Sequence, residues 1–178
     1  MKFATKAIHA GIEPDPSTGA IMTPIFQTST FAQPSLGENK GFEYARSSNP
    51  TRQTLEKSFA ALENAKYGFA FASGMAAIDT VMKLLKPNDE VVCGKDIYGG
   101  SYRLFVKIYE EVGIKFHFIG MQNAANIESY INDNTKLIWV ETPTNPMMNI
   151  IDIKATATIA KKHNVLLAVD NTFATPYL

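Results

Sequence analysis

Hydrophobic positions after residue 66 fall into two alternating spacings along the chain. Short continuous apolar runs predict buried strands, and apolar residues at three- and four-residue spacing predict amphipathic helices. The strands expected from this pattern are residues 67–72, 90–93, 115–119, 136–141 and 165–170. The helices expected between them are residues 74–85, 100–112, 124–132 and 153–163. Strands separated by helices are typical of parallel crossovers, so the pattern predicts an α/β fold with a doubly wound, mainly parallel sheet.

The last apolar run, residues 165–170, ends in the carboxylate of Asp170. Its continuous Val, Leu and Ala side chains predict a strand that is buried on both faces. Right-handed crossovers keep the strands parallel, so the residues that follow each strand should meet at one edge of the sheet. At that edge Asp170 is either a turn residue or a partner for a cationic ligand atom.

Residues 1–49 lack this periodicity and contain several Pro and Gly breakers, which predict an extended arm without a core of its own. An ordered arm of this kind must pack on something, in many sheet proteins on a neighbouring subunit. A helix is expected at about residues 51–64, because Asn49 or Thr51 suits its cap and Pro50 its first turn. We therefore divide the chain into an arm, residues 1–49, and an α/β domain, residues 50–178.

Composition argues against several classes of partner. Lys and Arg total 17 against 17 for Asp and Glu, so no net positive charge attracts nucleic acid or an anionic membrane. No apolar segment is long enough to span a bilayer, and we expect a cytoplasmic protein. The single cysteine, Cys93, excludes an internal disulfide and is expected to be buried. His9, His117 and His163 are scattered, so no metal site is predicted.

Residues 73–75 join an expected strand to an expected helix. A helix N-terminus presents unpaired N–H groups and a positive dipole end, and Gly74 lets the backbone approach an anion closely. Ser73, Gly74 and Met75 are therefore either phosphate contacts or an ordinary helix cap. No Gly-x-Gly-x-x-Gly follows the strand, so a single phosphate is favoured over a dinucleotide.

Other loops carry groups suited to a planar ligand. Tyr98 precedes two glycines, where its ring either lies on a ligand or packs in the core. Asn145 stands between two prolines, which make a rigid turn and fix the direction of its amide. In the arm, Tyr44 and Arg46 alternate onto one face, where a phenol and a guanidinium can bind phosphate together.

Together these groups describe a planar, phosphorylated ligand with a ring nitrogen that can be protonated. Residues 73–75 suit its phosphate, Tyr98 its ring face, Asn145 an oxygen substituent and Asp170 the nitrogen. A carboxylate beside a pyridine nitrogen keeps that nitrogen protonated, which makes the ring an electron sink. The pattern therefore predicts pyridoxal 5'-phosphate (PLP) as the cofactor.

The sequence resembles the Cys/Met-metabolism pyridoxal-phosphate enzymes, the trans-sulfuration family, at several motifs in one order. These are TKAIHAG at 5–11, GFEYARSSNPT at 41–51, ASGMAA at 72–77, DIYGG at 96–100, ETPTNP at 141–146 and VDNTF at 169–173. The resemblance implies the large domain of a PLP-dependent transferase of fold type I, the aspartate aminotransferase-like architecture, preceded by an extended N-terminal arm. It implies PLP as cofactor and no metal.

The resemblance also implies roles for individual residues. The cofactor-binding residues would be Tyr44, Arg46, Ser73, Gly74, Met75, Tyr98, Asn145, Asp170 and Thr172. Tyr98 and Asp170 would be catalytic, Tyr98 as an acid or base. Tyr44 and Arg46 would reach the phosphate of a neighbouring subunit, so a homodimer that pairs into a homotetramer is expected.

Details of the motifs look closer to cystathionine γ-synthases and γ-lyases than to methionine γ-lyases, which typically have Cys where Gly100 stands. Glu43 and Arg103 would then contact the substrate, although a helix-surface salt bridge is the alternative for Arg103. The Schiff-base lysine of the family lies in a Ser-x-Thr-Lys stretch, and this chain ends at Leu178 before such a stretch. We expect an incomplete chain, the N-terminal part of an enzyme whose C-terminal domain is absent.

The full-length protein is expected to act on a small amino-acid substrate, by γ-elimination or γ-replacement on cystathionine or activated homoserine. Two enzymatic alternatives remain open, methionine γ-lyase and O-acetylhomoserine sulfhydrylase. An alternative of another class is a truncated, non-catalytic binding or assembly module that lacks the Schiff-base lysine.

Overall fold

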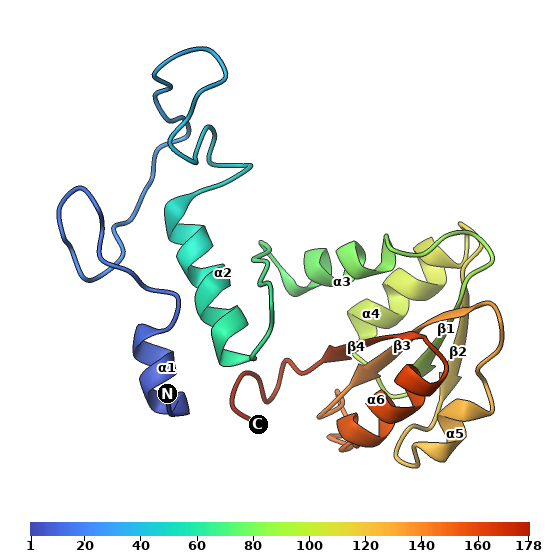
Figure 1. Ribbon diagram of the computed structural model, residues 1–178. Coiled ribbons are helices and arrows are strands. Elements are labelled where there is room, and N and C mark those ends of the chain that lie inside the picture. The colour runs from blue at the N-terminus through green and yellow to red at the C-terminus, as the bar shows by residue number, and fades with distance from the viewer. The chain divides into compact units, whose positions relative to one another are not determined.

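The computed structural model describes residues 1–178, which form two compact units. The first unit contains Met1–Ala70 and Tyr177, and the second contains Phe71–Pro176 and Leu178. Figure 1 shows the succession of helices and strands along the chain. None of the helices combines the length and the apolar composition needed to cross a bilayer.

The first unit contains two helices, α1 (Phe3–His9) and α2 (Pro50–Leu62), joined by irregular chain. The helix expected at 51–64 is confirmed as α2. Asn49 is its cap, because its side-chain oxygen accepts the N–H groups of Thr51 at 2.9 Å and Arg52 at 3.3 Å. The arm expected at residues 1–49 also contains α1, whose seven residues are too few to show a clear helical period in the sequence.

Two local features hold the start of the arm on α2. Lys6 Nζ donates to Asn64 Oδ1 at 2.6 Å and to the Ala61 carbonyl at 3.3 Å. Gly11 has a φ of 77°, and a Cβ placed there would lie 2.5 Å from the backbone nitrogen of Ser58. Only glycine fits this contact, so residue 11 fixes how closely the arm approaches α2.

The second unit is built on a parallel sheet with the strand order β2-β1-β3-β4. Its strands are β1 (Glu90–Gly94), β2 (Lys115–Ile119), β3 (Thr135–Glu141) and β4 (Leu166–Asp170). They confirm four of the expected strands and the predicted parallel α/β class. Because all four strands run the same way, their carboxyl ends share one edge of the sheet.

Helices cover both faces of this sheet (Figure 1). One face carries α3 (Gly74–Met82) and α4 (Gly99–Leu104), which continues into the π-helical segment η1 (Phe105–Tyr109). The other face carries α5 (Ala125–Glu128) and α6 (Ile153–Lys162). These confirm the helices expected at 74–85, 100–112, 124–132 and 153–163. Helices α3 and α5 are shorter than expected, and the helix expected at 100–112 is divided into α4 and η1.

The core of the second unit has one apolar layer on each face of the sheet. On the α3 side, Phe105 stacks on Phe116 with ring centroids 4.8 Å apart and meets Trp139 edge-on at 5.6 Å. The indole Nε1 of Trp139 is buried without a hydrogen-bond partner. Cys93 is fully buried in β1, as expected, and burial raises the pKa of its thiol. On the α6 side, Ile138 belongs to the layer formed with α5 and α6.

The strand expected at residues 67–72 is absent, and this prediction is wrong. Its aromatic alternation is typical of a strand, but no other segment pairs with it along its length. The backbone N–H of Ala70 instead donates to Glu56 Oε1 at 3.0 Å. Since a strand is defined by its partner, local alternation alone is not sufficient.

The expectation that residues 165–170 are buried on both faces is also wrong. β4 forms the edge of the sheet and pairs only with β3. Leu166 is 54% exposed, and the rest of the strand is half-buried. An apolar run does not say how many neighbours a strand has, so a central and an edge strand look alike in sequence.

At the opposite edge from the carboxyl ends, Glu90 is 8% exposed and holds a polar cluster. Hydrogen bonds from Asn132 and from His117 lower the pKa of the Glu90 carboxyl from 4.5 to about 2. Because the folded pKa is depressed, this contribution to stability is complete above pH 4.5 and is lost as the pH falls towards 2.

Glu90→Gln is therefore expected to flatten the dependence of stability on pH in this acid range, because the amide does not titrate. Urea unfolding measured at a series of acid pH values tests this result. Glu111→Gln, at an exposed position without an ion pair, is the control and should retain the wild-type dependence. Identical acid profiles for wild type and Glu90→Gln would contradict the assignment.

Candidate active site

The predicted site residues of the second unit lie at the carboxyl edge of the sheet. Tyr98 follows β1, Asn145 follows β3, and Asp170 ends β4. A Cβ placed at Gly100 would lie 3.0 Å from Met75 Sδ and 2.3 Å from the Tyr98 ring, so the start of α3 lies beside Tyr98. The structure thus brings together side chains that are 95 residues apart in the sequence, from Met75 to Asp170.

The N-terminus of α3 is capped and still open to a ligand. Ser73 Oγ accepts the N–H of Ala76 at 3.1 Å, so Ser73 does act as the helix cap. The N–H groups of Gly74 and Met75 make no hydrogen bond within the chain. A Cβ at Gly74 would have nothing within 4 Å, so this side of the helix is accessible to an anion.

Tyr98 presents its ring outside the core. Tyr98 is 42% exposed, and its ring covers Gly100, where a Cβ would lie 2.3 Å from Tyr98 Cε1. Its backbone N–H donates to Glu141 Oε2 at 2.8 Å. A half-exposed aromatic ring held by its own backbone can offer one face to a planar ligand.

Asn145 and Asp170 each keep a polar group available. The Asn145 backbone N–H donates to Glu141 Oε1 at 2.7 Å, whereas its side-chain amide makes no hydrogen bond within the chain. Asp170 Oδ1 accepts the hydroxyl of Thr172 and, at 3.2 Å, its N–H. Asp170 Oδ2 has no partner within the chain, so Thr172 orients the carboxylate and leaves one oxygen for a ligand.

Glu141 lies at the centre of this arrangement, although the sequence did not point to it as a site residue. It is 5% exposed and pairs in register with Asp170 across β3 and β4. Burial raises the pKa of the Glu141 carboxyl, while the N–H groups of Tyr98 and Asn145 act in the opposite direction. A carboxylate placed directly after a buried apolar run is the signal in the sequence that marks this position.

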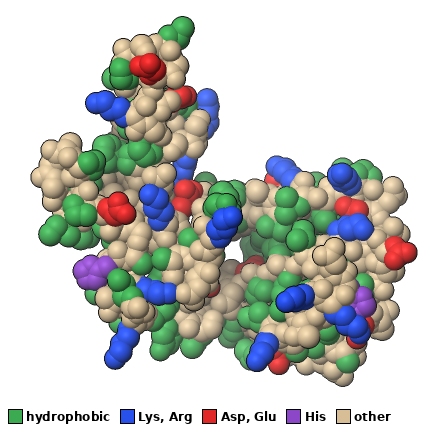
Figure 2. Space-filling view, viewed as in Figure 1, with side chains coloured by type: hydrophobic (Ala, Val, Ile, Leu, Met, Phe, Trp, Pro, Cys, Tyr) green, Lys and Arg blue, Asp and Glu red, His purple; other side chains and the backbone are tan.

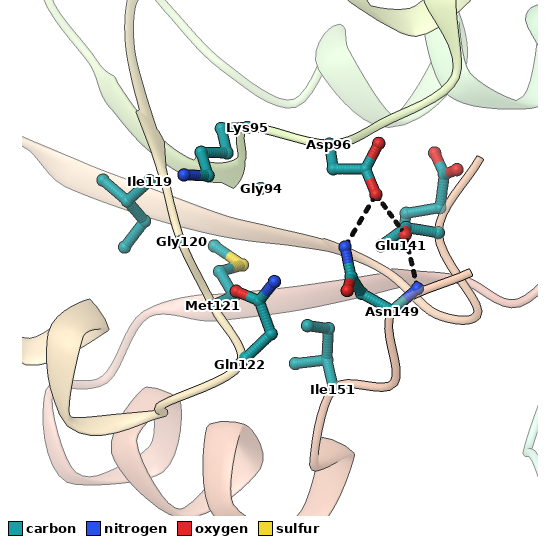
Figure 3. A pocket seen from close by; sticks show the side chains of 11 residues that line it. Gly94, Lys95, Asp96, Ile119, Gly120, Met121, Gln122, Glu141, Asn149 and Ile151 are labelled. Atoms are coloured by element: carbon teal, nitrogen blue, oxygen red, sulfur yellow. Dashed lines mark hydrogen bonds between the residues drawn. The ribbon is translucent and has the colours of Figure 1, made fainter. Parts of the chain in front are cut away.

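A second carboxylate, Asp96, lies nearby in a small pocket lined by both polar and apolar side chains (Figure 3). Asp96 Oδ2 accepts the hydroxyl of Thr144 and, at 2.9 Å, the side-chain amide of Asn149. Thr144 Oγ1 in turn accepts the backbone N–H of Asn149 at 2.8 Å. Lys95 extends towards Ile119 and away from Asp96, so this lysine does not pair with the acid (Figure 3).

The remaining predicted residues belong to the first unit, except Arg103, which lies on α4. In the first unit, the Arg46 guanidinium lies 4.9 Å from the centroid of the Tyr44 ring, and Glu43 accepts a hydrogen bond from Asn39. Arg103 is exposed on α4 and forms no ion pair within the chain. Figure 2 shows Lys and Arg interspersed with Asp and Glu on the face of the second unit in view, as the equal numbers of the two charges predict.

Gly100→Ala is expected to displace the Tyr98 ring while changing stability little. The atoms that a Cβ would meet most closely are the outer ring atoms of Tyr98, which lie at the far end of a half-exposed side chain from its held backbone. Helix α4 gains about 1 kcal/mol from replacing glycine with alanine, which offsets the cost of moving the ring. A crystal structure together with urea unfolding checks both parts, and a ring that stays over position 100 would contradict the prediction.

Comparison with known proteins relates this edge of the sheet to one family. The family model described as Cys/Met metabolism PLP-dependent enzyme matches residues 4–178. The chain is 50% identical to a probable cystathionine gamma-synthase of Herpetosiphon aurantiacus over 175 residues, which cover 98% of this chain and 55% of that protein. It is 49% identical to a cystathionine beta-lyase of Coxiella burnetii over 175 residues, which cover 98% of this chain and 45% of that protein.

A solved structure agrees closely with the fold. The crystal structure of cystathionine gamma-lyase from Lactobacillus plantarum in complex with L-serine superposes with a TM-score of 0.94 at 46% identity. The match covers 99% of this chain and 46% of that chain. The chain spans about half the length of the curated relatives that it matches.

Proposed function

We propose, because the chain belongs to the Cys/Met metabolism PLP-dependent enzyme family, that the whole protein acts on cystathionine or activated homoserine by γ-elimination or γ-replacement. The observation that carries the proposal is the convergence of Tyr98, Asn145 and Asp170 at one edge of the sheet. Each of these residues presents a ring face, an amide or a carboxylate oxygen that is available to a ligand.

The residues at this edge fit PLP, which when bound supplies an electron sink for charge that develops on an amino-acid substrate. The free N–H groups at the start of α3, with Ser73, Gly74 and Met75, would hold the phosphate. Tyr98 would lie on the ring, and the Asn145 amide would donate to the ring oxygen. Asp170, oriented by Thr172, would hold a proton on the ring nitrogen.

The arm and the helix that follows β1 complete the proposed site. Tyr44 and Arg46, which already lie against each other, would bind the phosphate in a neighbouring subunit. Glu43 and Arg103 would contact the amino-acid substrate, and Tyr98 would transfer a proton as an acid or base. We propose a homodimer that pairs into a homotetramer in the cytoplasm, with residues 1–49 as the intersubunit arm and residues 50–178 as part of the PLP domain.

The experiment uses the full-length protein that contains this chain, supplied with PLP and cystathionine. Cleavage on the γ side of the sulfur releases cysteine, and cleavage on the β side releases homocysteine, so thiol analysis distinguishes the two reactions. We expect cysteine as the main thiol. Activated homoserine with cysteine, methionine, and O-acetylhomoserine with sulfide are the further substrate tests.

Cleavage on the β side is the second candidate, because a cystathionine beta-lyase is 49% identical to this chain. Homocysteine as the main product would select it. The absence of turnover on every substrate, with PLP bound, would overturn the proposed reaction class.

A further inference from the structure

Two carboxylates, the buried Glu141 and the half-buried Asp96, connect the loop after β1 with the loop after β3, and each acid reaches into the other loop. Glu141, at the end of β3, accepts the backbone N–H of Tyr98 from the first loop at 2.8 Å. Its second oxygen accepts the N–H of Asn145 at 2.7 Å. The two backbone groups that it holds therefore belong to the residues proposed for the face and the oxygen of the cofactor ring.

Asp96 makes the reciprocal connection from the loop after β1. Its Oδ2 accepts the Thr144 hydroxyl and the Asn149 side-chain amide, both from the loop after β3 (Figure 3). Thr144 is 4% exposed and directly precedes Asn145. Asp96 therefore holds the turn that presents the Asn145 amide. Asp96 itself lies two residues before Tyr98 in the loop after β1.

Burial of Glu141 and of Thr144, the partner of Asp96, makes these connections strong and sensitive to change. Hydrogen bonds to a carboxylate are stronger than those between neutral groups, and they gain further strength away from water. Both oxygens of Glu141 have backbone donors, so the 5% exposed carboxylate is satisfied by the two loops together. If the N–H of Tyr98 or of Asn145 moved away, the buried Glu141 carboxylate would have one donor fewer.

We propose that Glu141 and Asp96 are a reciprocal pair of positioning residues, which fix the backbone positions of Tyr98 and Asn145 relative to each other before the cofactor binds. The inference rests on the proposed function, because it assigns the pair to the PLP site. Neither acid needs to touch the cofactor, since each acts through the backbone or the turn of the residue that does.

The test compares Asp96→Ala, Glu141→Gln and the double variant in the full-length protein. At position 141, Gln keeps one acceptor and presents an NH₂ group to the second N–H, so one donor loses its partner. At position 96, Ala removes the oxygen that accepts both Thr144 and Asn149. Each single variant is expected to bind PLP about tenfold more weakly or worse. The circular dichroism of the bound cofactor should weaken in parallel, because it reports how rigidly the ring is held.

The double variant distinguishes a reciprocal pair from two independent contacts. We expect it to lose less affinity than the product of the two single losses, because the connection is broken only once. Glu90→Gln removes a carboxylate of similar burial at the opposite edge of the sheet and should leave PLP binding unchanged. Losses that multiply fully in the double variant would overturn the reciprocity.

Amide hydrogen exchange in the cofactor-free protein provides an independent measurement. Asp96→Ala removes no hydrogen bond of the Tyr98 N–H directly, yet we expect this N–H and that of Asn145 to exchange faster. Unchanged exchange there would overturn the inference, even if the double variant fails to fold. Wild-type protein that does not bind PLP would overturn the proposed function, whereas normal PLP binding in both single variants would overturn this inference alone.

Discussion

Asp170→Asn is expected to lower kcat/KM of the full-length enzyme about a hundredfold or more, the largest effect that we predict for one residue. The amide carries no negative charge, so it cannot keep a pyridine nitrogen protonated, and the ring would accept less charge from the substrate. Asn at this position can still accept the hydroxyl of Thr172, so the fold of the loop should persist. Steady-state turnover of cystathionine, with saturating PLP, measures the loss.

Asp152→Asn is the matched control for this substitution. Asp152 caps α6 by accepting the N–H of Ala155 at 2.8 Å, and asparagine caps helices equally well. The control therefore removes one carboxylate charge without removing the cap, and activity close to wild type is expected. Full activity in Asp170→Asn would contradict the role of Asp170 as the partner of the ring nitrogen.

Phe105→Ala is expected to destabilise the second unit by about 3–5 kcal/mol. The Phe105 side chain is fully buried, stacks on Phe116 with an interplanar angle of 7° and contacts Trp139 edge-on. Removing the ring leaves a cavity between η1 and the sheet that the surrounding strands cannot close. Urea unfolding followed by far-ultraviolet circular dichroism gives the change in free energy.

Ile108→Ala provides the comparison within the same π-helical segment. Ile108 is 53% exposed, so its truncation is expected to cost no more than about 1 kcal/mol. If the two alanine variants were equally stable, η1 would not anchor the core through Phe105. A larger loss of stability for Ile108→Ala than for Phe105→Ala would also contradict the role of Phe105 in the core.

The parts of the fold that local pattern determines could be predicted from the sequence. Val91, Val92 and Cys93 form a continuous apolar run, and the structure has β1 there. The parts that depend on distant partners could not be predicted in this way. Residues 67–72 have the alternation of a strand but no partner, and residues 165–170 have the composition of a central strand but lie at an edge.

The same division applies to the candidate site. Ser73 as a helix cap could be predicted, because the capping bond spans three residues. The bond from Tyr98 to Glu141 joins residues that are 43 positions apart, so no local spacing reveals it. The roles of Tyr44, Arg46 and the other predicted contacts with PLP remain predictions.

Trp139 has a practical consequence for following the folding of this protein. It is the one tryptophan among these 178 residues and lies 3% exposed in β3, with no hydrogen-bond partner for its indole. The fluorescence of this indole therefore reports on the apolar core at the middle of the sheet. A red shift of its fluorescence would mark the moment when water enters the second unit, and the first unit would contribute no tryptophan signal.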